Sequence, residues 1–185
     1  MIRRFYHWLH GQWPAGRPEP LPRVGEHGRT RLPGVYVVGD LSGIPLLKLS
    51  IQSGVEAVRD AREHLRSEGA VDVCVIGGGT AGLSAAVEAK RAGLSYRLLE
   101  ANRLFSTIHN FPKGKPIYTY PSGMQPPGDI QVQAPVKEEL IDELEAQARA
   151  HRLEATEAYA SHVEAGGGTL TVHLKDAEPI TARAV

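Results

Sequence analysis

The sequence predicts an α/β fold with a central βαβ unit, and two observations support this prediction. A short run of mostly β-branched residues, 71–76, leads directly into a glycine-rich turn. An alanine-rich stretch, 83–92, follows the turn, closes at Gly93 as helices often do, and gives way to a second apolar run at 96–100. Strand, glycine turn, helix and strand in this order form a βαβ unit with a right-handed crossover.

The segments on either side of this unit extend the predicted architecture. Residues 35–38 predict a buried strand that ends in a tight Gly-Asp turn. Apolar residues recur at helical spacing across 46–66 and again across 136–149, so each stretch predicts an amphipathic helix. The proline-rich residues 104–135 predict a long loop, and loops of this length inside a compact domain are often functional.

The C-terminal residues predict short strands at 158–164, 169–174 and 180–185. Alternating polar and apolar residues favour a small antiparallel hairpin formed by the first two strands. The last residue, Val185, falls inside a predicted strand, so we expect a domain that is truncated at its C-terminus. The sequence thus predicts an aromatic and proline-rich, extended N-terminal arm at 1–29, a segment at 30–66, and a main domain at 70–185.

Composition excludes several classes of function. Lys+Arg and Asp+Glu both number 21, which gives no excess of cations for binding nucleic acid. Cys74 is the single cysteine, so a disulfide framework and an internal CxxC redox pair are excluded, and a reducing, cytoplasmic location is favoured. Because Cys74 falls within a predicted strand, we expect a buried, inert thiol. His7 and His10 have no third ligand nearby, so no metal site is expected.

No apolar run reaches the roughly 20 residues needed to cross a bilayer. The N-terminal arm combines aromatic and basic residues, a combination that also occurs at membrane interfaces. Because the stretch is too short for a large amphipathic face, we expect the arm to pack on its own protein or on a partner subunit.

The glycine turn has the spacing Gly77-x-Gly79-x-x-Gly82, which is typical of dinucleotide binding when a strand precedes it and a helix follows. Gly77 permits the tight turn, Gly79 lets the backbone approach a pyrophosphate, and Gly82 lets the helix pack closely. The free amides of Thr80, Ala81 and Gly82 would face the diphosphate at the positive end of the helix. The sequence therefore predicts a Rossmann-like FAD/NAD(P)-binding βαβ fold.

Glu100 ends the second strand of the unit, 18 residues after Gly82. A carboxylate at this place accepts hydrogen bonds from the hydroxyls of the adenosine ribose and repels a 2′-phosphate, which disfavours NADP here. The spacing alone does not distinguish FAD from NAD. A glycine-rich turn that binds nothing, with Glu100 as a solvated strand end, is the alternative interpretation.

Two segments resemble the thioredoxin reductase-like and pyridine nucleotide-disulfide oxidoreductase superfamily. Residues 71–100 resemble its N-terminal flavin motif. Residues 30–58, which contain Thr30-x-x-Pro33-Gly34-Val35-Tyr36-Val37-Val38-Gly39-Asp40, resemble its second flavin motif. The resemblance implies that Gly39 and Asp40 lie near the FAD ribityl chain and pyrophosphate. It also implies that Lys48 lies where the following helix meets the flavin ring, where its charge could stabilise a reduced flavin.

A third, shorter resemblance lies in the predicted long loop. Asn110-Phe111-Pro112 is similar to the loop that runs beside the flavin in thioredoxin reductase-like proteins. This implies that Asn110 contributes to the flavin site. His109 adjoins the loop, and we consider either a role in proton transfer or a structural loop histidine.

The sequence departs from this superfamily in two ways. The Gly-Asp motif normally follows the glycine turn along the chain, but here it precedes it. Either residues 30–65 still dock beside the strand at 71–76, because chain order need not equal spatial order, or they are a remnant of a fused neighbouring module. In addition, the chain has no second GxGxxG for a nicotinamide cofactor and no redox cysteine pair.

The sequence therefore predicts an FAD-dependent oxidoreductase that transfers electrons from NAD(P)H to an acceptor, with FAD as its cofactor and the NAD(P)H domain missing. Its partners would be the dinucleotide and a second copy or another subunit, because missing strands expose sheet edges. One alternative is the NAD-binding domain of a dehydrogenase. The other is a non-catalytic dinucleotide-binding module.

Overall fold

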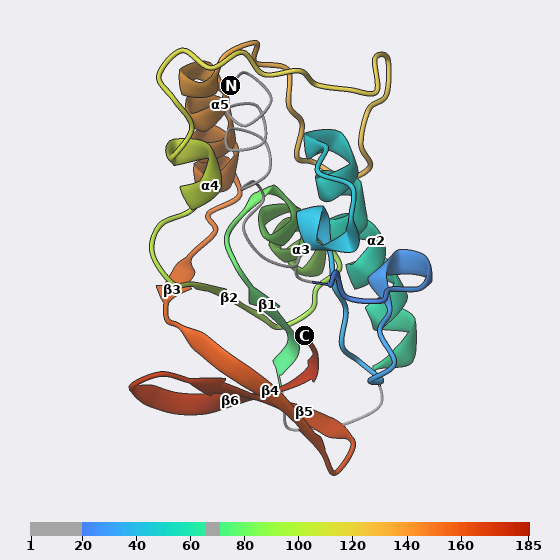
Figure 1. Cartoon of the computed structure of the whole chain (residues 1–185). Coiled ribbons are helices and arrows are strands. Elements are labelled where there is room, and N and C mark those ends of the chain that lie inside the picture. The colour runs from blue at the N-terminus through green and yellow to red at the C-terminus, as the bar shows by residue number, and fades with distance from the viewer. Residues whose placement is uncertain (1–19, 66–70) are drawn as a thin grey trace, which may run out of the picture.

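The computed structural model describes residues 20–65 and 71–185, and in them a mixed sheet carries helices on one face (Figure 1). The strands of the sheet follow the order β3-β2-β1-β6-β5-β4. The helices are α2 (Leu47–His64), α3 (Thr80–Arg91), α4 (Ser106–His109) and α5 (Lys137–Ala150), with 3-10 turns η1 (Glu26–Gly28) and η2 (Gly39–Ser42). The strands are β1 (Val71–Ile76), β2 (Tyr96–Glu100), β3 (Ala155–Glu157), β4 (Ala160–Gly166), β5 (Thr169–Leu174) and β6 (Ala177–Ala184).

The predicted βαβ unit is present as β1-α3-β2. β1 and β2 pair in parallel, from Val73 beside Tyr96 to Ile76 beside Leu99. α3 begins at Thr80, three residues earlier than the alanine-rich run indicated, because the glycine turn feeds directly into the helix. Its small residues let the helix lie flat on the sheet, where Ala85, Ala86 and Ala89 pack against β1 and β2.

The helical layer is held together by a tight crossing of α2 and α3 (Figure 1). Gly54 of α2 lies against the carbonyl oxygen of Ala81 in the first turn of α3, so closely that an added Cβ would overlap that oxygen. Ile51 and Val55, on the same side of α2, are buried. A glycine in mid-helix lowers helix propensity, but here it allows the two backbones to approach.

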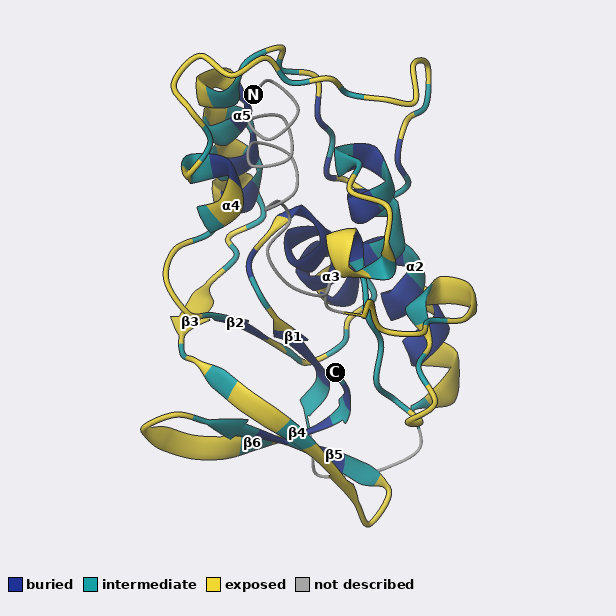
Figure 2. Ribbon diagram, viewed as in Figure 1, coloured by how far each residue is buried: buried dark blue, intermediate teal, exposed yellow. Residues whose placement is uncertain are grey.

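A second apolar cluster joins α2 and α3 to α4, α5 and the long loop. Its buried members are Ile51, Leu83, Val87, Phe105, Ile108, Ile130, Val132, Leu140, Leu144 and Ala148. The predicted loop at 104–135 therefore contributes core residues and also contains the short helix α4, which the sequence pattern did not indicate. Figure 2 shows α3 buried on most of its surface, whereas α5 exposes one side.

The C-terminal strands form a three-stranded antiparallel meander, β4-β5-β6, instead of an isolated hairpin. β6 pairs with β5 on one side and with β1, in parallel, on the other. The strand predicted at 180–185 thus joins the parallel and antiparallel parts of one sheet. Cys74, Leu99, Val172 and Ala182 form a small core on the face opposite the helices.

Residues 30–65 pack against the rest of the chain and lie beside the end of β6. The amide of Val185 donates to the carbonyl of Gly34 at 2.9 Å, and the amide of Tyr36 donates back to the carbonyl of Val185 at 2.8 Å. This pattern is that of a parallel strand pair centred on Val35. A regular buried strand at 35–38 is not formed, however, because these residues make only local bridges and stay half-buried.

One polar network fastens this segment to α2. Arg29 donates to both carboxylate oxygens of Asp60, at 2.6 and 2.7 Å, and the hydroxyl of Tyr36 donates to Asp60 at 2.8 Å. The hydrogen bonds from Arg29 hold the pKa of Asp60 below its ordinary value. Burial, together with the bond to Asp60, raises the pKa of Tyr36 to about 12.

Residues 1–19, which hold the aromatic part of the predicted arm together with His7 and His10, lie outside the described residues. Among the residues that are described, no helix is long and apolar enough to cross a bilayer.

Candidate dinucleotide site

The glycine turn closes between β1 and α3. Gly77 adopts φ +100°, a backbone conformation that side chains disfavour, and its amide donates to the carbonyl of Leu99 at 2.8 Å. An added Cβ on Gly82 would overlap the carbonyl oxygen of Gly77, so this glycine allows the helix to start against the turn. An added Cβ on Gly79 would meet no atom within 4 Å, so the space beside this residue is open.

Glu100 braces the same turn from the end of β2. One carboxylate oxygen accepts the amide of Gly78 at 2.7 Å, and the other accepts the amide of Asn102 at 3.0 Å. Each carboxylate oxygen has a second lone pair, so both can accept one more hydrogen bond. Glu100 is therefore oriented by its own chain and still able to receive hydroxyl donors.

The Gly39-Asp40 turn lies directly beside the first turn of α3. Gly39 adopts φ +73°, and an added Cβ would come within 3.1 Å of the Cβ of Ala81. The carboxylate of Asp40 accepts a hydrogen bond from the hydroxyl of Ser50 on α2 at 2.9 Å. The two motifs, whose order in the chain is inverted, are thus adjacent in space.

A cavity of ≈ 640 Å³ lies between these elements, and both motifs line it. Its walls include Gly77, Gly79, Thr80, Ala81, Gly82 and Glu100 from the βαβ unit, and Gly39 and Asp40 from the N-terminal segment. The first amides of an α-helix have no acceptor within the helix, so the amides at the start of α3 can bind an anion in the cavity. Two carboxylates and a helix N-terminus are among the polar groups that line this space.

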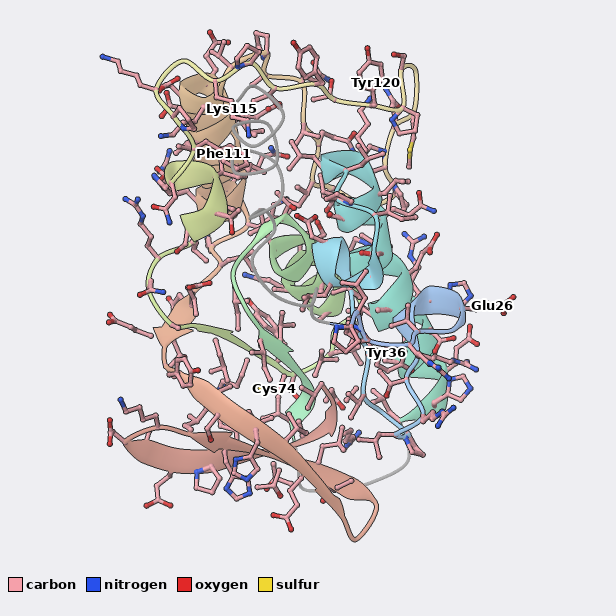
Figure 3. The ribbon with its side chains drawn as sticks, viewed as in Figure 1. Glu26, Tyr36, Cys74, Phe111, Lys115 and Tyr120 are labelled. Carbon is pink, nitrogen blue, oxygen red and sulfur yellow. The ribbon has the colours of Figure 1, made fainter. Side chains whose placement is uncertain are left out.

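Sequence reasoning missed several lining residues. Ser50, Ser106 and Thr107 contribute hydroxyl-bearing side chains, while Leu41 and Ile76 contribute exposed apolar ones. Ser106 and Thr107 belong to α4, which had no sequence signal beyond its place in the long loop. Phe111 of the predicted flavin-like loop also lines the cavity, and the ammonium group of Lys115 lies 3.6 Å from the centroid of its ring (Figure 3).

Three residues predicted for the site or considered beside it are not among those that line the cavity. The ammonium group of Lys48 donates to the carbonyl of Pro121 at 3.1 Å, so it binds the long loop to α2. Asn110 is exposed at the C-terminal end of α4. A ring nitrogen of His109 lies 3.6 Å from Glu145 of α5. The flavin roles of Lys48 and Asn110 remain predictions, and the position of His109 is consistent with a structural histidine.

Cys74 is fully buried in β1, as expected (Figure 3). Burial raises the pKa of its thiol to about 11, which suppresses the reactive thiolate at neutral pH. Among the described residues no group of three or more His, Cys, Asp or Glu side chains is arranged to hold a metal ion.

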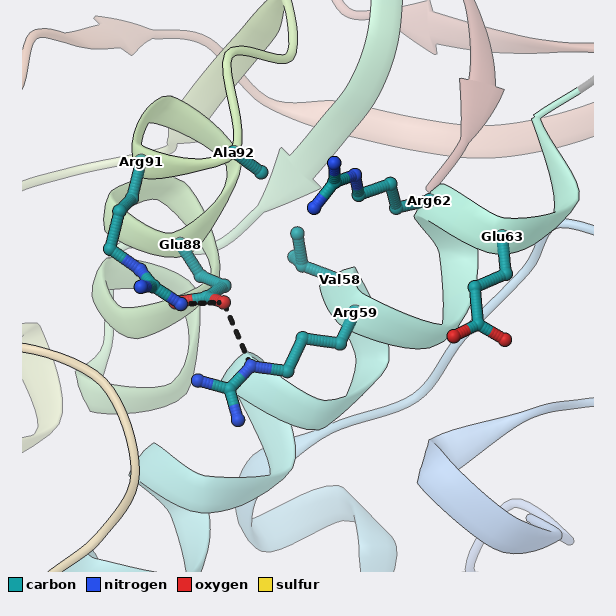
Figure 4. A pocket seen from close by; sticks show the side chains of 7 residues that line it. All are labelled: Val58, Arg59, Arg62, Glu63, Glu88, Arg91 and Ala92. Carbon is teal, nitrogen blue, oxygen red and sulfur yellow. Dashed lines mark hydrogen bonds and ion pairs between the residues drawn. The ribbon is translucent and has the colours of Figure 1, made fainter.

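A second cavity, of ≈ 400 Å³, lies between α2 and α3 near their C-terminal ends (Figure 4). Its buried acid, Glu88, accepts hydrogen bonds from Arg59 at 2.8 Å and from Arg91 at 2.7 and 2.9 Å. Burial by itself would raise the pKa of Glu88, but the bonds from Arg91 and Arg59 outweigh it, and the pKa lies below its ordinary value. This charge cluster ties the two helices together.

Comparison with known protein families gives a match in the same part of the chain as the glycine turn. The family model for FAD dependent oxidoreductase matches residues 72–105, which hold the glycine turn and Glu100. No curated protein sequence matches the chain.

Several solved structures share the fold. One is the bacillithiol disulfide reductase Bdr of Staphylococcus aureus, with 23% identity and a TM-score of 0.53 over 61% of this chain. Another is a flavin-containing monooxygenase from Stenotrophomonas maltophilia, with 28% identity and a TM-score of 0.53 over 62% of this chain. A third is OTEMO in complex with FAD and NADP, with 20% identity and a TM-score of 0.50 over 63% of this chain.

The matches span 36% of the reductase and monooxygenase chains and 25% of OTEMO, so the chain corresponds to about a third of such proteins or less. Residues 72–105, which hold most of the βαβ unit, thus match the family model for FAD dependent oxidoreductase, and about three fifths of the chain shares its fold with the solved reductase and monooxygenase structures.

Proposed function

We propose that this chain forms the FAD-binding part of an oxidoreductase that transfers electrons from NAD(P)H to an acceptor. One observation carries the proposal: two motifs from distant parts of the sequence line the same cavity. The Gly39-Asp40 turn and the Gly77–Gly82 turn both border the N-terminal end of α3. A Rossmann-type NAD site requires the glycine turn and Glu100 alone, whereas a flavin site also uses a second acidic turn.

The residues that are present fit a flavin dinucleotide. The open space at Gly79 and the amides at the start of α3 would receive the diphosphate, which a side chain at this position would obstruct. Glu100 would accept the hydroxyls of the adenosine ribose, and Asp40 would accept hydroxyls of the ribityl chain. Lys48 and Asn110 are not among the residues that line the cavity. A contact with the flavin ring would require each side chain to turn toward it. Bound FAD would supply the redox chemistry, while the protein would orient it and exclude water.

Several finer statements belong to the same proposal. A nicotinamide domain would reside in parts of the protein that correspond to the remaining two thirds of the related structures. A cytoplasmic location and association with a second copy or another subunit remain predictions.

The proposal is tested with the visible absorption spectrum of the purified chain before and after addition of FAD, followed by gel filtration. We expect a flavin band that elutes with the protein and an Asp40→Ala variant that binds FAD at least about tenfold more weakly, because a hydrogen bond to a charged group is lost. NAD is titrated in parallel. Binding of NAD without FAD would indicate a nicotinamide-binding domain, and binding of neither would contradict the proposal.

A further inference from the structure

The Gly39-Asp40 turn is held by Ser50 and Ser53 of α2, which lie within the segment 30–58 but to which the sequence assigned no role. The hydroxyl of Ser50 donates to a carboxylate oxygen of Asp40 at 2.9 Å. The hydroxyl of Ser53 accepts the amide of Gly39 at 2.9 Å and donates to the carbonyl of Ser50 at 2.8 Å. Ser53 thus links the backbone of α2 to the backbone of the turn, while Ser50 separately binds the acidic side chain that faces the cavity.

Ser50 and Ser53, here called the serine clamp, are buried and half-buried respectively, whereas the Asp40 side chain is exposed toward the cavity. Ser50 is 3% exposed, and Gly39 is buried between α2 and the first turn of α3. Hydrogen bonds in such surroundings are stronger than in water, and a buried donor left without an acceptor costs free energy. The orientation of Asp40 is therefore fixed by α2 and not by the loop that carries it.

The turn itself adds further restraint on the solvent side. The hydroxyl of Ser42 donates to the carbonyl of Gly39 at 2.7 Å, and the amide of Gly43 donates to the carbonyl of Asp40 at 3.0 Å. These bonds close η2 on itself but leave the carboxylate unrestrained. Among residues 20–65 and 71–185, Ser50 is the only residue whose side chain donates a hydrogen bond to that carboxylate.

We propose that Ser50 and Ser53 are positioning residues for the cofactor site, and that they hold Asp40 in the orientation that receives FAD. The inference rests on the proposed function. Ser50 uses one carboxylate oxygen of Asp40 as acceptor and leaves the other free for a ligand. A site arranged in this way does not need to order the Asp40 side chain when FAD binds, so less conformational entropy is lost on binding.

The first arm of the test needs no cofactor. Hydrogen–deuterium exchange of the full chain is followed in peptides that span residues 37–47, for the unaltered protein and for Ser50→Ala and Ser53→Ala. We expect faster exchange in this region in both variants, and most clearly in Ser53→Ala, because the amide of Gly39 loses its acceptor. Unchanged exchange in both variants would overturn the clamp.

The second arm measures the affinity for FAD by titration. We expect Ser50→Ala to bind FAD about tenfold more weakly, since a hydrogen bond to a charged group is removed. In an Asp40→Asn background the same change should have less than about a twofold effect, because Ser50 acts through Asp40. Full additivity of the two changes, or an unchanged affinity in Ser50→Ala, would overturn the inference while leaving the proposed function intact.

Ser95→Ala is the matched control. The hydroxyl of Ser95 also donates to a carboxylate, that of Asp72, at 2.7 Å, but neither residue lines the cavity. This variant should bind FAD as the unaltered chain does. If the unaltered chain binds no FAD, the proposed function fails, and the role of the serines in binding fails with it, whereas the exchange measurement still reports whether they hold the turn.

Discussion

At the scale of single residues, the glycines of the turn are distinguished by what surrounds them. Gly77 is required for its backbone conformation and Gly82 for contact with the carbonyl of Gly77, whereas the space beside Gly79 is open. The spacing of the motif predicted the first two features, and the approach of a pyrophosphate to Gly79 stays a prediction. It did not predict that Gly78 packs against Leu104 or that Glu100 accepts the amide of Gly78.

The contact at Gly82 gives a prediction about stability. We expect Gly82→Ala to lower the free energy of unfolding by about 2 kcal/mol or more, because the new methyl group overlaps a backbone oxygen and α3 must move off the turn. Urea unfolding measures this difference. Gly166→Ala is the control, since an added Cβ there meets no atom within 4 Å, and this variant should unfold close to the unaltered chain. Equal stability of the two variants would contradict the close contact.

Other residue-level outcomes required the tertiary structure. Lys48 was expected beside the flavin ring, yet its ammonium group contacts Pro121, a residue 73 positions later in the chain. Ser50 and Ser53 lie within the segment 30–58 that resembles the second flavin motif, but the sequence assigned neither of them a role. Their importance comes from the turn that packs against them, and no local pattern encodes that packing.

At the scale of secondary structure elements, long periodic segments were predicted well. The helices expected at 46–66 and 136–149 are observed as Leu47–His64 and Lys137–Ala150. The expected strand at 35–38 is only a short bridged segment, because its partners are single residues near Arg29 and Val185. Short apolar runs form strands only when a neighbouring strand is present along their whole length.

The attachment of this bridged segment to α2 gives a pH-dependent prediction. Asp60 has a pKa held below its ordinary value of 3.8, mainly by hydrogen bonds from Arg29. A depressed carboxyl pKa contributes stability above the unfolded pKa, and that contribution is lost as the pH falls through the folded pKa. We therefore expect Asp60→Asn to lower the free energy of unfolding by about 2 kcal/mol at neutral pH, with the difference shrinking below about pH 4.

Urea unfolding at neutral and acidic pH tests this prediction. The control is Asp142→Asn, because Asp142 is exposed on α5 and no ion pair of its carboxylate is described. A difference between Asp60→Asn and the unaltered chain that grows as the pH falls would contradict the assignment.

At the scale of the whole molecule, the inverted motif order is accommodated by packing. α2 ends near the start of β1 in the chain, and the segment before α2 returns to the end of β6. Of the two explanations considered for the inversion, docking within one fold describes the observed packing, although the segment bonds to the end of β6 and faces the strand at 71–76 only across the shared cavity. Two segments can occupy the same places in a fold in either chain order when the chain ends that would be joined lie close together.

The charge of the cavity gives a prediction for the whole molecule. Its described lining contains Asp40 and Glu100 but no lysine, arginine or histidine. A diphosphate ligand would thus bind to helix amides in a cavity that carries two negative charges. Because salt screens repulsion between like charges, the affinity for FAD should stay constant or rise between about 0.05 and 0.5 M salt. Fluorescence titration of FAD at several salt concentrations measures this, and a steep loss of affinity with salt would reveal cationic contacts.

The sequence by itself determined the βαβ unit, its glycine turn, the two long amphipathic helices and the residue types of a dinucleotide site. These are local properties, set by periodicity and by the backbone freedom of glycine within a few residues. Only the tertiary structure decided that β6 joins the two parts of the sheet, that the Gly39-Asp40 turn faces Gly77–Gly82, and that Ser50 orients Asp40. Those outcomes depend on contacts between residues far apart in the chain, and such contacts follow from packing, which no local pattern of residues contains.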